Sequence, residues 1–475
     1  MDNIIYKKVK KYFEDNKKTI IDELEELIKI PSVNNHDSEY IFGTEVNRAL
    51  EAGAALAAKY GFEAKVKGSY AIAHFGKGSK SIGLFGHLDV VPANEKDWVY
   101  TKPFLPFIND GFIIGRGSED DKAAIVIGCH VAAAIREIGI SLGSEITLFM
   151  GGNEECGMRD IADFVQNEKM PDISIIPDNE FPVCIGEKGI CCITAKCRMP
   201  FESIRRIYGG MAHNVVLGEV AAELDYDDIT AADLLDAINK TKDIKAEVNK
   251  EGINVKAFGV SAHAAYPENS FNAGINLADL LCGFNRISEN DKKILRFMRS
   301  VQERPYGEPF GIESEDEHFG KLTAVNGIVR TENGQLVLLF DIRYGTSVEN
   351  EKMLKKIIKV FDENGWDVRI DEDEEGFELP CDSETVKAFE NIYNAVSGEK
   401  FARADYSGGG TYARKLKNAY SVGTSIYNGE GGNMPVGHGG AHQSDECISV
   451  EGMLLAAQAI TLMVIEADEQ LNKEI

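Results

Sequence analysis

Hydrophobic and polar positions change pattern partway along this chain, which predicts two regions of different structure. Between residues 81 and 188, the apolar runs SIGLFGHLD, SEITLFMGG and ISIIPDNE alternate with a helical stretch at residues 122–139. Short buried strands that alternate with helices are typical of a parallel sheet with crossover helices. We therefore expect an α/β domain over residues 1–188.

The second region begins near Gly189. From Cys191 to Cys197 apolar residues alternate with Cys192, Thr194 and Lys196, as in a strand with one buried face. Further apolar patterns predict strands at residues 253–263 and 335–344 and helices at residues 270–287 and 348–364. Residues 189–382 are therefore expected to form an α+β domain. Helical patterns at residues 383–397 and from residue 450 suggest that residues 383–475 return to the first domain.

Composition excludes several classes of protein. The 475 residues are too many for one hydrophobic core. With 77 acidic against 51 basic residues and a formal charge of -26, the surface repels nucleic acid and anionic membranes. The nine cysteines form no CxxC pair and indicate a reducing compartment. The apolar stretch at residues 453–465 is too short to span a membrane and no secretory signal is apparent, so a soluble cytoplasmic protein is expected.

The first candidate functional residues lie at the end of an apolar run. His87 and Asp89 lie two residues apart, so both side chains project from one face at the carboxyl end of a predicted strand. Ligands bind at that edge of open α/β sheets. A histidine there can ligate a metal while the neighbouring carboxylate accepts its other ring N–H. A plain strand-end histidine explains this pair equally well.

Acidic residues follow the other predicted strands. Asp120 and Asp121 precede a helix, where Asp121 is also a candidate N-cap. Glu154 and Glu155 follow one apolar run and Asp178 follows another. Carboxylates at buried strand ends are costly to desolvate unless a cation offsets their charge.

Together these residues predict a metal site. Two histidines and three carboxylates with mixed N/O ligation suit two divalent ions about 3.5–4 Å apart. An oxygen-rich set with only two histidines tolerates several divalent ions, among them zinc, manganese and cobalt. The five candidate ligands are His87, Asp120, Glu155, Asp178 and His442.

The motifs also carry a family resemblance. GHLDVVP, GRGSEDDKA, GGNEECG, PDNEFPVCIGEKG, GGGTYAR and AHQSDE occur in this order along the chain. This set resembles the aminoacylase/carboxypeptidase/ArgE-DapE superfamily of co-catalytic zinc peptidases, and most of all its PepV-type dipeptidases. The resemblance runs from about Lys29 to Glu446. It implies a zinc-exopeptidase-like catalytic domain, with a mixed, mostly parallel sheet sandwiched by helices, and an inserted α+β lid domain.

The resemblance implies a role for each candidate in the catalytic domain. His87 and Asp178 would hold one zinc ion, Glu155 and His442 the other, and Asp120 would bridge both. Asp89 would support the ligands. Glu154 would act as general base on the attacking water and then as general acid towards the leaving amine. A cis peptide bond would join Asp120 and Asp121.

In the lid, the resemblance implies residues that hold the substrate. His263 and Asn214 would stabilise the oxyanion, and Arg343 would bind the C-terminal carboxylate of the peptide. Backbone N–H groups of Gly408, Gly409 and Gly410 would assist Arg343. Two plainer interpretations stay open, since His263 could be a strand-end histidine and Arg343 could form a surface ion pair.

Three positions depart from the family pattern. Ala123, Ala264 and Gly345 stand where glycine, glycine and proline are usual. None is a candidate ligand, so these changes bear on specificity more than on catalysis. The lid is as long as in PepV-type enzymes, which favours a monomer.

The resulting hypothesis is a two-metal dipeptidase that acts on short unblocked peptides. An N-acyl amino acid deacylase or carboxypeptidase with the same metals is the alternative within enzymes. A module that binds an amino acid or a metal without catalysis is a third possibility. Glu154 argues against that third possibility, because a binding module needs the ligands but not the additional carboxylate.

Overall fold

The structure is a computed structural model that describes residues 3–35, 39–225, 243–249, 252–426 and 434–473. The chain forms two compact units. The second unit comprises Gly186–Glu378 and Tyr406–Gly409, and the first unit comprises the rest. The second unit is therefore built from two segments of the chain. No pattern in the sequence indicates that the short segment at residues 406–409 belongs to it.

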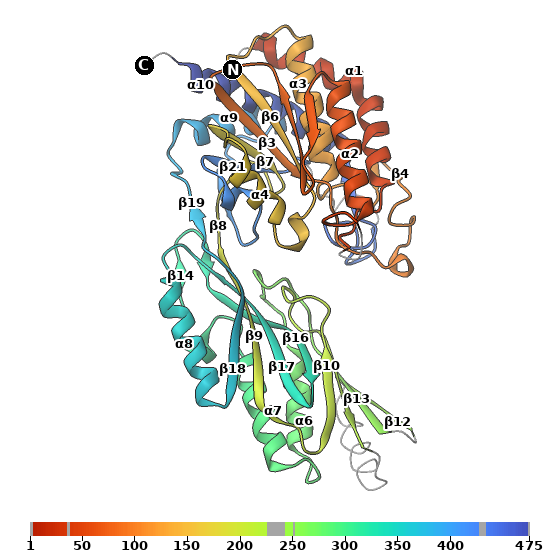
Figure 1. The fold of residues 1–475 in the computed structure, drawn as a ribbon, viewed down its shortest axis with the longest axis vertical. Coiled ribbons are helices and arrows are strands. Elements are labelled where there is room, and N and C mark those ends of the chain that lie inside the picture. The colour runs from red at the N-terminus through yellow and green to blue at the C-terminus, as the bar shows by residue number, and fades with distance from the viewer. Residues whose placement is uncertain (1–2, 36–38, 226–242, 250–251, 427–433, 474–475) are drawn as a thin grey trace. The chain divides into compact units, whose positions relative to one another are not determined.

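A mixed sheet forms the centre of the first unit (Figure 1). The neighbouring strands β6, β3, β7 and β21 run parallel, whereas β1, β2 and β8 pair antiparallel. The strand order is β1 (Glu63–Val66), β2 (Tyr70–Phe75), β6 (Ser144–Gly151), β3 (Lys80–His87), β7 (Ile173–Pro177), β21 (Ala419–Val422), β8 (Cys184–Glu187) and β19 (Phe377–Glu378), and β20 (Asp405–Ser407) pairs with β8. The strand β19 and the ends of β8 and β20 consist of residues assigned to the second unit. A smaller sheet has the order β22 (Cys447–Ser449), β5 (Phe112–Ile114) and β4 (Phe107–Asn109).

Helices cover both faces of the mixed sheet. Successive strand residues point to opposite faces, so a strand that is apolar throughout needs helices packed on both sides. Leu148 of β6 lies against Gly128 of α3. The next residue, Phe149, contacts Phe164 of α4 and Tyr412 on the other side. The predicted α/β sandwich is confirmed. The helices of this unit are α1 (Asn3–Ile28), α2 (Thr44–Lys59), α3 (Lys122–Glu137), α4 (Arg159–Asn167), α9 (Glu384–Ser397) and α10 (Val450–Asn472), with short 3₁₀ segments η1 (Glu95–Asp97), η2 (Glu154–Cys156) and η4 (Tyr412–Lys415).

The final helix, α10, is longer than the apolar stretch that the sequence marks. Among the described residues it alone is long and apolar enough to cross a membrane. However, 83% of its most apolar window is buried inside the structure, where α10 packs against α1, α3 and α9. A buried core helix passes the same test of length and composition, so α10 is weak evidence for a membrane span.

The second unit is an antiparallel sheet with helices on one face. Its strand order is β12 (Ile244–Asn249), β13 (Gly252–Phe258), β11 (Glu219–Leu224), β10 (Ile204–Gly209), β16 (Thr323–Glu332), β17 (Gln335–Tyr344), β9 (Gly189–Pro200) and β18 (Trp366–Glu374). The other elements are α6 (Ala273–Cys282), α7 (Glu289–Gln302), α8 (Asn350–Glu363), η3 (Glu308–Phe310) and the pair β14 (Glu315–Asp316) and β15 (Gly320–Lys321). Together they make the α+β fold that the sequence predicts.

The expected helix at residues 270–287 is too long. In the structure α6 ends at Cys282, and a second helix, α7, begins at Glu289. The Ser288 side chain caps α7 by accepting a hydrogen bond from the Asp291 N–H. An apolar pattern that continues through Ile287 conceals this boundary, because Ile287 also belongs to the core.

Candidate metal centre and active site

The candidate residues of the first unit gather because parallel strands end at one edge of a sheet. His87 is the last residue of β3, Glu154 and Glu155 follow β6, and Asp178 follows β7. Asp120 comes just before α3. His442, far away in the sequence, has a left-handed backbone with a φ of 64° and reaches the same place.

One group of donors forms around His87. Its Nδ1 lies 2.9 Å from the backbone oxygen of Asp89, which can only accept, so Nδ1 carries the proton. In the neutral imidazole, the lone pair of Nε2 then faces Asp120 Oδ1 at 2.9 Å and Asp178 Oδ1 at 3.8 Å. Nε2 is buried, and its geometry makes no hydrogen bond. A nitrogen lone pair aimed at two carboxylates fits a shared cation.

A second group shares Asp120 with the first. His442 Nε2 lies 3.0 Å from Asp120 Oδ2 and 3.0 Å from Glu155 Oε1. Within each group, the ligand atoms lie within 4.8 Å of one another. The structure thus brings all five predicted ligands into two groups joined by one carboxylate. The peptide bond between Asp120 and Asp121 is cis, as the family resemblance implies.

Burial and crowding of acids set the electrostatics of this region. Burial, and then the charge of Asp178, raises the pKa of Glu154 well above its usual range. Burial and Asp120 raise the pKa of Glu155 to about 7. Burial lowers the pKa of His442, but contacts with Asp120 and Glu155 outweigh this effect and raise that pKa to about 11. Besides burial, these shifts reflect concentrated negative charge, which a divalent cation would offset.

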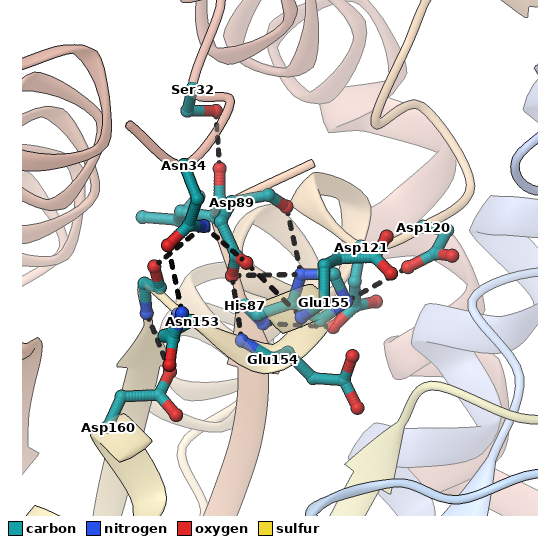
Figure 2. A network of polar contacts seen from close by, with 12 residues as sticks. Ser32, Asn34, His87, Asp89, Asp120, Asp121, Asn153, Glu154, Glu155 and Asp160 are labelled. Carbon is teal, nitrogen blue, oxygen red and sulfur yellow. Dashed lines mark hydrogen bonds and ion pairs between the residues drawn. The ribbon is translucent and has the colours of Figure 1, made fainter. Parts of the chain in front are cut away.

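Asp89 holds the turn that carries the two glutamates (Figure 2). Its Oδ1 accepts from the Glu154 N–H at 3.1 Å, and its Oδ2 accepts from the Glu155 N–H at 3.2 Å and from Asn34 Nδ2 at 2.9 Å. The carboxylate also stays near the His87 ring, as expected, with Oδ1 3.5 Å from Nδ1, but the backbone oxygen at 2.9 Å is the nearer acceptor. The backbone oxygen of Asp89 orients the imidazole, and its carboxylate positions Glu154 and Glu155.

Asp121 also differs from expectation. It occupies the N-cap position of α3, but its side chain makes no capping hydrogen bond. Its Oδ2 instead accepts from the backbone N–H of His87 at 3.1 Å. Asp121 thus ties the start of α3 to the end of β3.

Sequence reasoning missed a buried ion pair beneath Asp120. Glu446 Oε1 accepts from the backbone N–H groups of Gly117, Glu119 and Asp120 at 3.0–3.2 Å. Glu446 Oε2 accepts from Arg116 Nη1, and Arg116 Nη2 donates to the backbone oxygen of His442 at 3.1 Å. The Glu446–Arg116 ion pair therefore holds both the loop of Asp120 and the loop of His442, two of the candidate metal ligands. Both residues lie inside the motifs GRGSEDD and AHQSDE, but nothing local in the sequence shows that they meet.

A cavity of about 220 Å³ adjoins the ligand groups within the first unit. Burial, followed by the charges of Glu446 and Asp120, raises the pKa of Glu119 on its wall to about 8. Its lining is polar and acidic, and comprises Glu119, Asp120, Asp178, Asn179, Glu180, Thr424, Ser425 and Ala441. Such a lining suits a cationic or hydrogen-bonding group rather than an apolar one.

In the second unit, Asn214 and His263 are neighbours. The Ala264 N–H donates to the Asn214 backbone oxygen at 2.8 Å, and Val215 forms a β-bridge with His263. His263 Nδ1 accepts from the Ala265 N–H at 3.2 Å. In the neutral imidazole the proton therefore lies on Nε2, which is the state of a hydrogen-bond donor.

Arg343 is not the surface ion pair of the plainer interpretation. It is 6% exposed, and Nε and Nη2 donate to the fully buried Asp341 at 2.6 and 2.8 Å. Nη1 lies 3.4 Å from the backbone oxygen of Gly408. Two remaining N–H groups at the tip of the fork, on Nη1 and Nη2, keep the geometry that binds a carboxylate.

The expected donors at the glycine run need correction. The Gly408 N–H donates to Tyr266 Oη at 3.1 Å, and the Gly409 N–H donates to Ser407 Oγ at 3.0 Å. These two groups are committed within the protein. Gly408 contributes its carbonyl oxygen to Arg343 instead, while Gly410 belongs to the first unit.

An α/β unit with histidines and carboxylates gathered at the carboxyl edge of its sheet has the make-up of a metal-dependent hydrolase. The profile of peptidase family M20/M25/M40 matches residues 83–466. The chain belongs to this family, which confirms the predicted peptidase class.

Curated relatives and solved structures are similar to this protein over most or almost all of its chain. YtjP of Bacillus subtilis is 30% identical over 94% of this chain and 97% of its own. The β-Ala-Xaa dipeptidase of Lactobacillus delbrueckii subsp. lactis is 29% identical over 88% of this chain and 91% of its own. The di-peptidase Dug1p from Saccharomyces cerevisiae and human carnosine dipeptidase 1 share the fold, with TM-scores of 0.61 and 0.59 at 15% and 13% identity, each over 98% of this chain and 98% and 99% of theirs.

The Glu446–Arg116 pair generates a first prediction. Glu446→Gln removes the charge that holds the Asp120 loop and Arg116, so we expect zinc affinity to fall by about 10–100-fold. Competition titration with a chelator measures this change. Glu451→Gln, on the exposed first turn of α10, should leave the affinity unchanged. Equal affinities in the two variants would contradict the positioning role of Glu446.

Proposed function

We propose that this chain is a metal-dependent dipeptidase that hydrolyses short unblocked peptides. The observation that carries the proposal is the pair of donor groups joined by Asp120, with the half-buried Glu154 near enough for Asp178 and Glu155 to raise its pKa. Membership of the peptidase family and the dipeptidase named among the relatives support it.

The donors fit two divalent ions. His87 and Asp178 would hold one ion, Glu155 and His442 the other, and Asp120 both, and the buried lone pair of His87 Nε2 supports this fit. When bound, the ions would supply Lewis acidity and lower the pKa of water towards neutrality. Nitrogen and oxygen ligands without a thiolate suit zinc and also accommodate manganese or cobalt.

Glu154 is the proton carrier in this proposal. Its carboxylate takes a proton from the attacking water and later delivers it to the leaving amine. Asp89 accepts a hydrogen bond from the backbone N–H of Glu154 at 3.1 Å, which fixes the backbone from which this side chain projects. The charge of the bound ions would keep Glu154 ionised despite its burial, because nearby cations favour the charged form.

We also propose roles for three residues of the second unit. The Nε2–H of His263 would donate to the carbonyl oxygen of the substrate, and Asn214 would assist it. The tip of Arg343 binds the C-terminal carboxylate, with the rest of the guanidinium fixed by Asp341.

The acidic cavity favours a dipeptide over an N-acyl amino acid. Glu119 and Glu180 on its wall hold no metal in this proposal, and their carboxyl groups suit the ammonium group of a free amino terminus, whereas an acyl cap carries no positive charge. A module that only binds ligands would not need Glu154. We further propose that the enzyme acts as a monomer in the cytoplasm, where its nine free cysteines would stay reduced.

Replacement of the proton carrier tests the mechanism. Glu154→Gln should keep the bound metal but reduce kcat by about 10²–10⁴-fold, because the side chain no longer accepts a proton. Metal content and dipeptide turnover are measured on the same preparation. Glu51→Gln, on an exposed position of α2, is the matched control. Near-normal turnover of the Glu154 variant would remove Glu154 from this role.

A panel of substrates tests the reaction class. We expect the metal-reconstituted enzyme to cleave free dipeptides, with little action on tetrapeptides or acetylated amino acids. Hydrolysis is followed by release of free amino acids, with zinc, manganese and cobalt compared. Equal turnover of dipeptides and tetrapeptides would contradict the length limit, and faster deacetylation would favour the deacylase.

The carboxylate clamp gives a further prediction. Arg343→Lys keeps a charge for Asp341 but loses the two-pronged donor, so KM for dipeptides should rise by about tenfold or more. Dipeptide amides, which lack the carboxylate, should show a much smaller change. Arg330→Lys, half-exposed on β16, is the control. An unchanged kcat/KM for free dipeptides would discredit the clamp.

A further inference from the structure

Cys192 differs from its neighbours in β9. Cys191, Ile193, Ala195 and Cys197 point into the core shared with α6, α7 and α8. Cys192 lies on the opposite face of the sheet, so it is not a filler of that core. Its register partners are Asp341 of β17 and Glu372 of β18, which places a thiol between two acids.

A histidine completes this cluster. The ligand atoms of Cys192, His213 and Glu372 lie within 4.8 Å of one another. In a tetrahedral zinc site, such ligand atoms lie about 3.4–3.6 Å apart, so the three side chains would close by about an ångström around an ion. Cys192 is 7% exposed, whereas the His213 side chain is 46% exposed and Glu372 lies at the surface. An ion can therefore enter from solvent and reach the thiol.

The charges of this face favour a cation. Asp341 is committed to Arg343, and His213 Nε2 lies 3.9 Å from Asp341 Oδ2. Glu372 brings a second carboxylate next to the thiol. Burial, and then Asp341, raises the pKa of Cys192, so the thiol keeps its proton unless a metal displaces it.

We propose that the second unit binds a thiophilic divalent ion, such as Zn²⁺, through Cys192, His213 and Glu372. As the bond between Sγ and the metal forms, the S–H bond breaks and its proton passes to solvent, with no change of oxidation state. Three protein ligands leave a fourth position for water. Asp341 stays paired with Arg343, so this site and the carboxylate clamp can coexist.

Cobalt provides a probe that separates this site from the first unit. A thiolate bound to Co²⁺ gives a ligand-to-metal charge-transfer band in the near ultraviolet, whereas imidazole and carboxylate ligands do not. The donor groups of the first unit contain no cysteine. Titration of the full chain with Co²⁺ should therefore produce this band only from the second unit.

We expect the band in the unmodified chain and its loss in Cys192→Ser. Cys156→Ser is the control, because Cys156 is exposed and follows Glu155 directly. His213→Ala alters a half-exposed loop residue without touching the sheet, and should weaken Co²⁺ binding at this site at least tenfold even if Cys192→Ser misfolds.

The proposal is overturned if saturating Co²⁺ gives no band, if the band survives Cys192→Ser, or if Cys156→Ser removes it. It is also overturned if His213→Ala leaves the affinity unchanged. None of these outcomes bears on dipeptide hydrolysis, because the band reports only a thiolate ligand.

Discussion

Buried negative charge is the constraint on which the first unit depends. Parallel strands place the carboxyl ends of β3, β6 and β7 at one edge, and each end delivers an acid or a histidine. Desolvated carboxylates are tolerated only where donors or cations compensate them. Asp89 receives backbone N–H groups, Glu446 receives Arg116, and Asp120 faces two histidines. The acids that would hold metal, Asp120, Glu155 and Asp178, face the ring nitrogens of His87 and His442.

Hydrogen bonds beneath the ligands explain how residues far apart in sequence keep their places. The Glu446–Arg116 pair links the loop before α3 to the loop that carries His442, across more than 300 residues of sequence. Asp121 and Asp89 link the end of β3 to α3 and to η2. Outer contacts of this kind orient metal ligands and tune their basicity. Catalysis by Glu154 would therefore depend on these supporting hydrogen bonds as well as on the metal ligands.

In the second unit, a single antiparallel sheet serves two purposes because its side chains alternate. One face buries aliphatic and aromatic residues against α6, α7 and α8, which gives the unit its own core. The other face carries Asp341 and Arg343 in β17, with Cys192 and Glu372 in the strands beside it. Substrate binding and the proposed additional metal site thus share the face opposite α6, α7 and α8.

The sequence by itself determined the α/β and α+β regions, the five ligand candidates and Glu154, because strands, their polar ends and short motifs are local patterns. Only the tertiary structure decided the end of α6, the bonds of Asp89 and Asp121, the committed N–H groups of Gly408 and Gly409, and the meeting of Arg116 with Glu446. Donors and acceptors pair by proximity in space. No periodicity along the chain encodes which distant backbone group a buried carboxylate will meet.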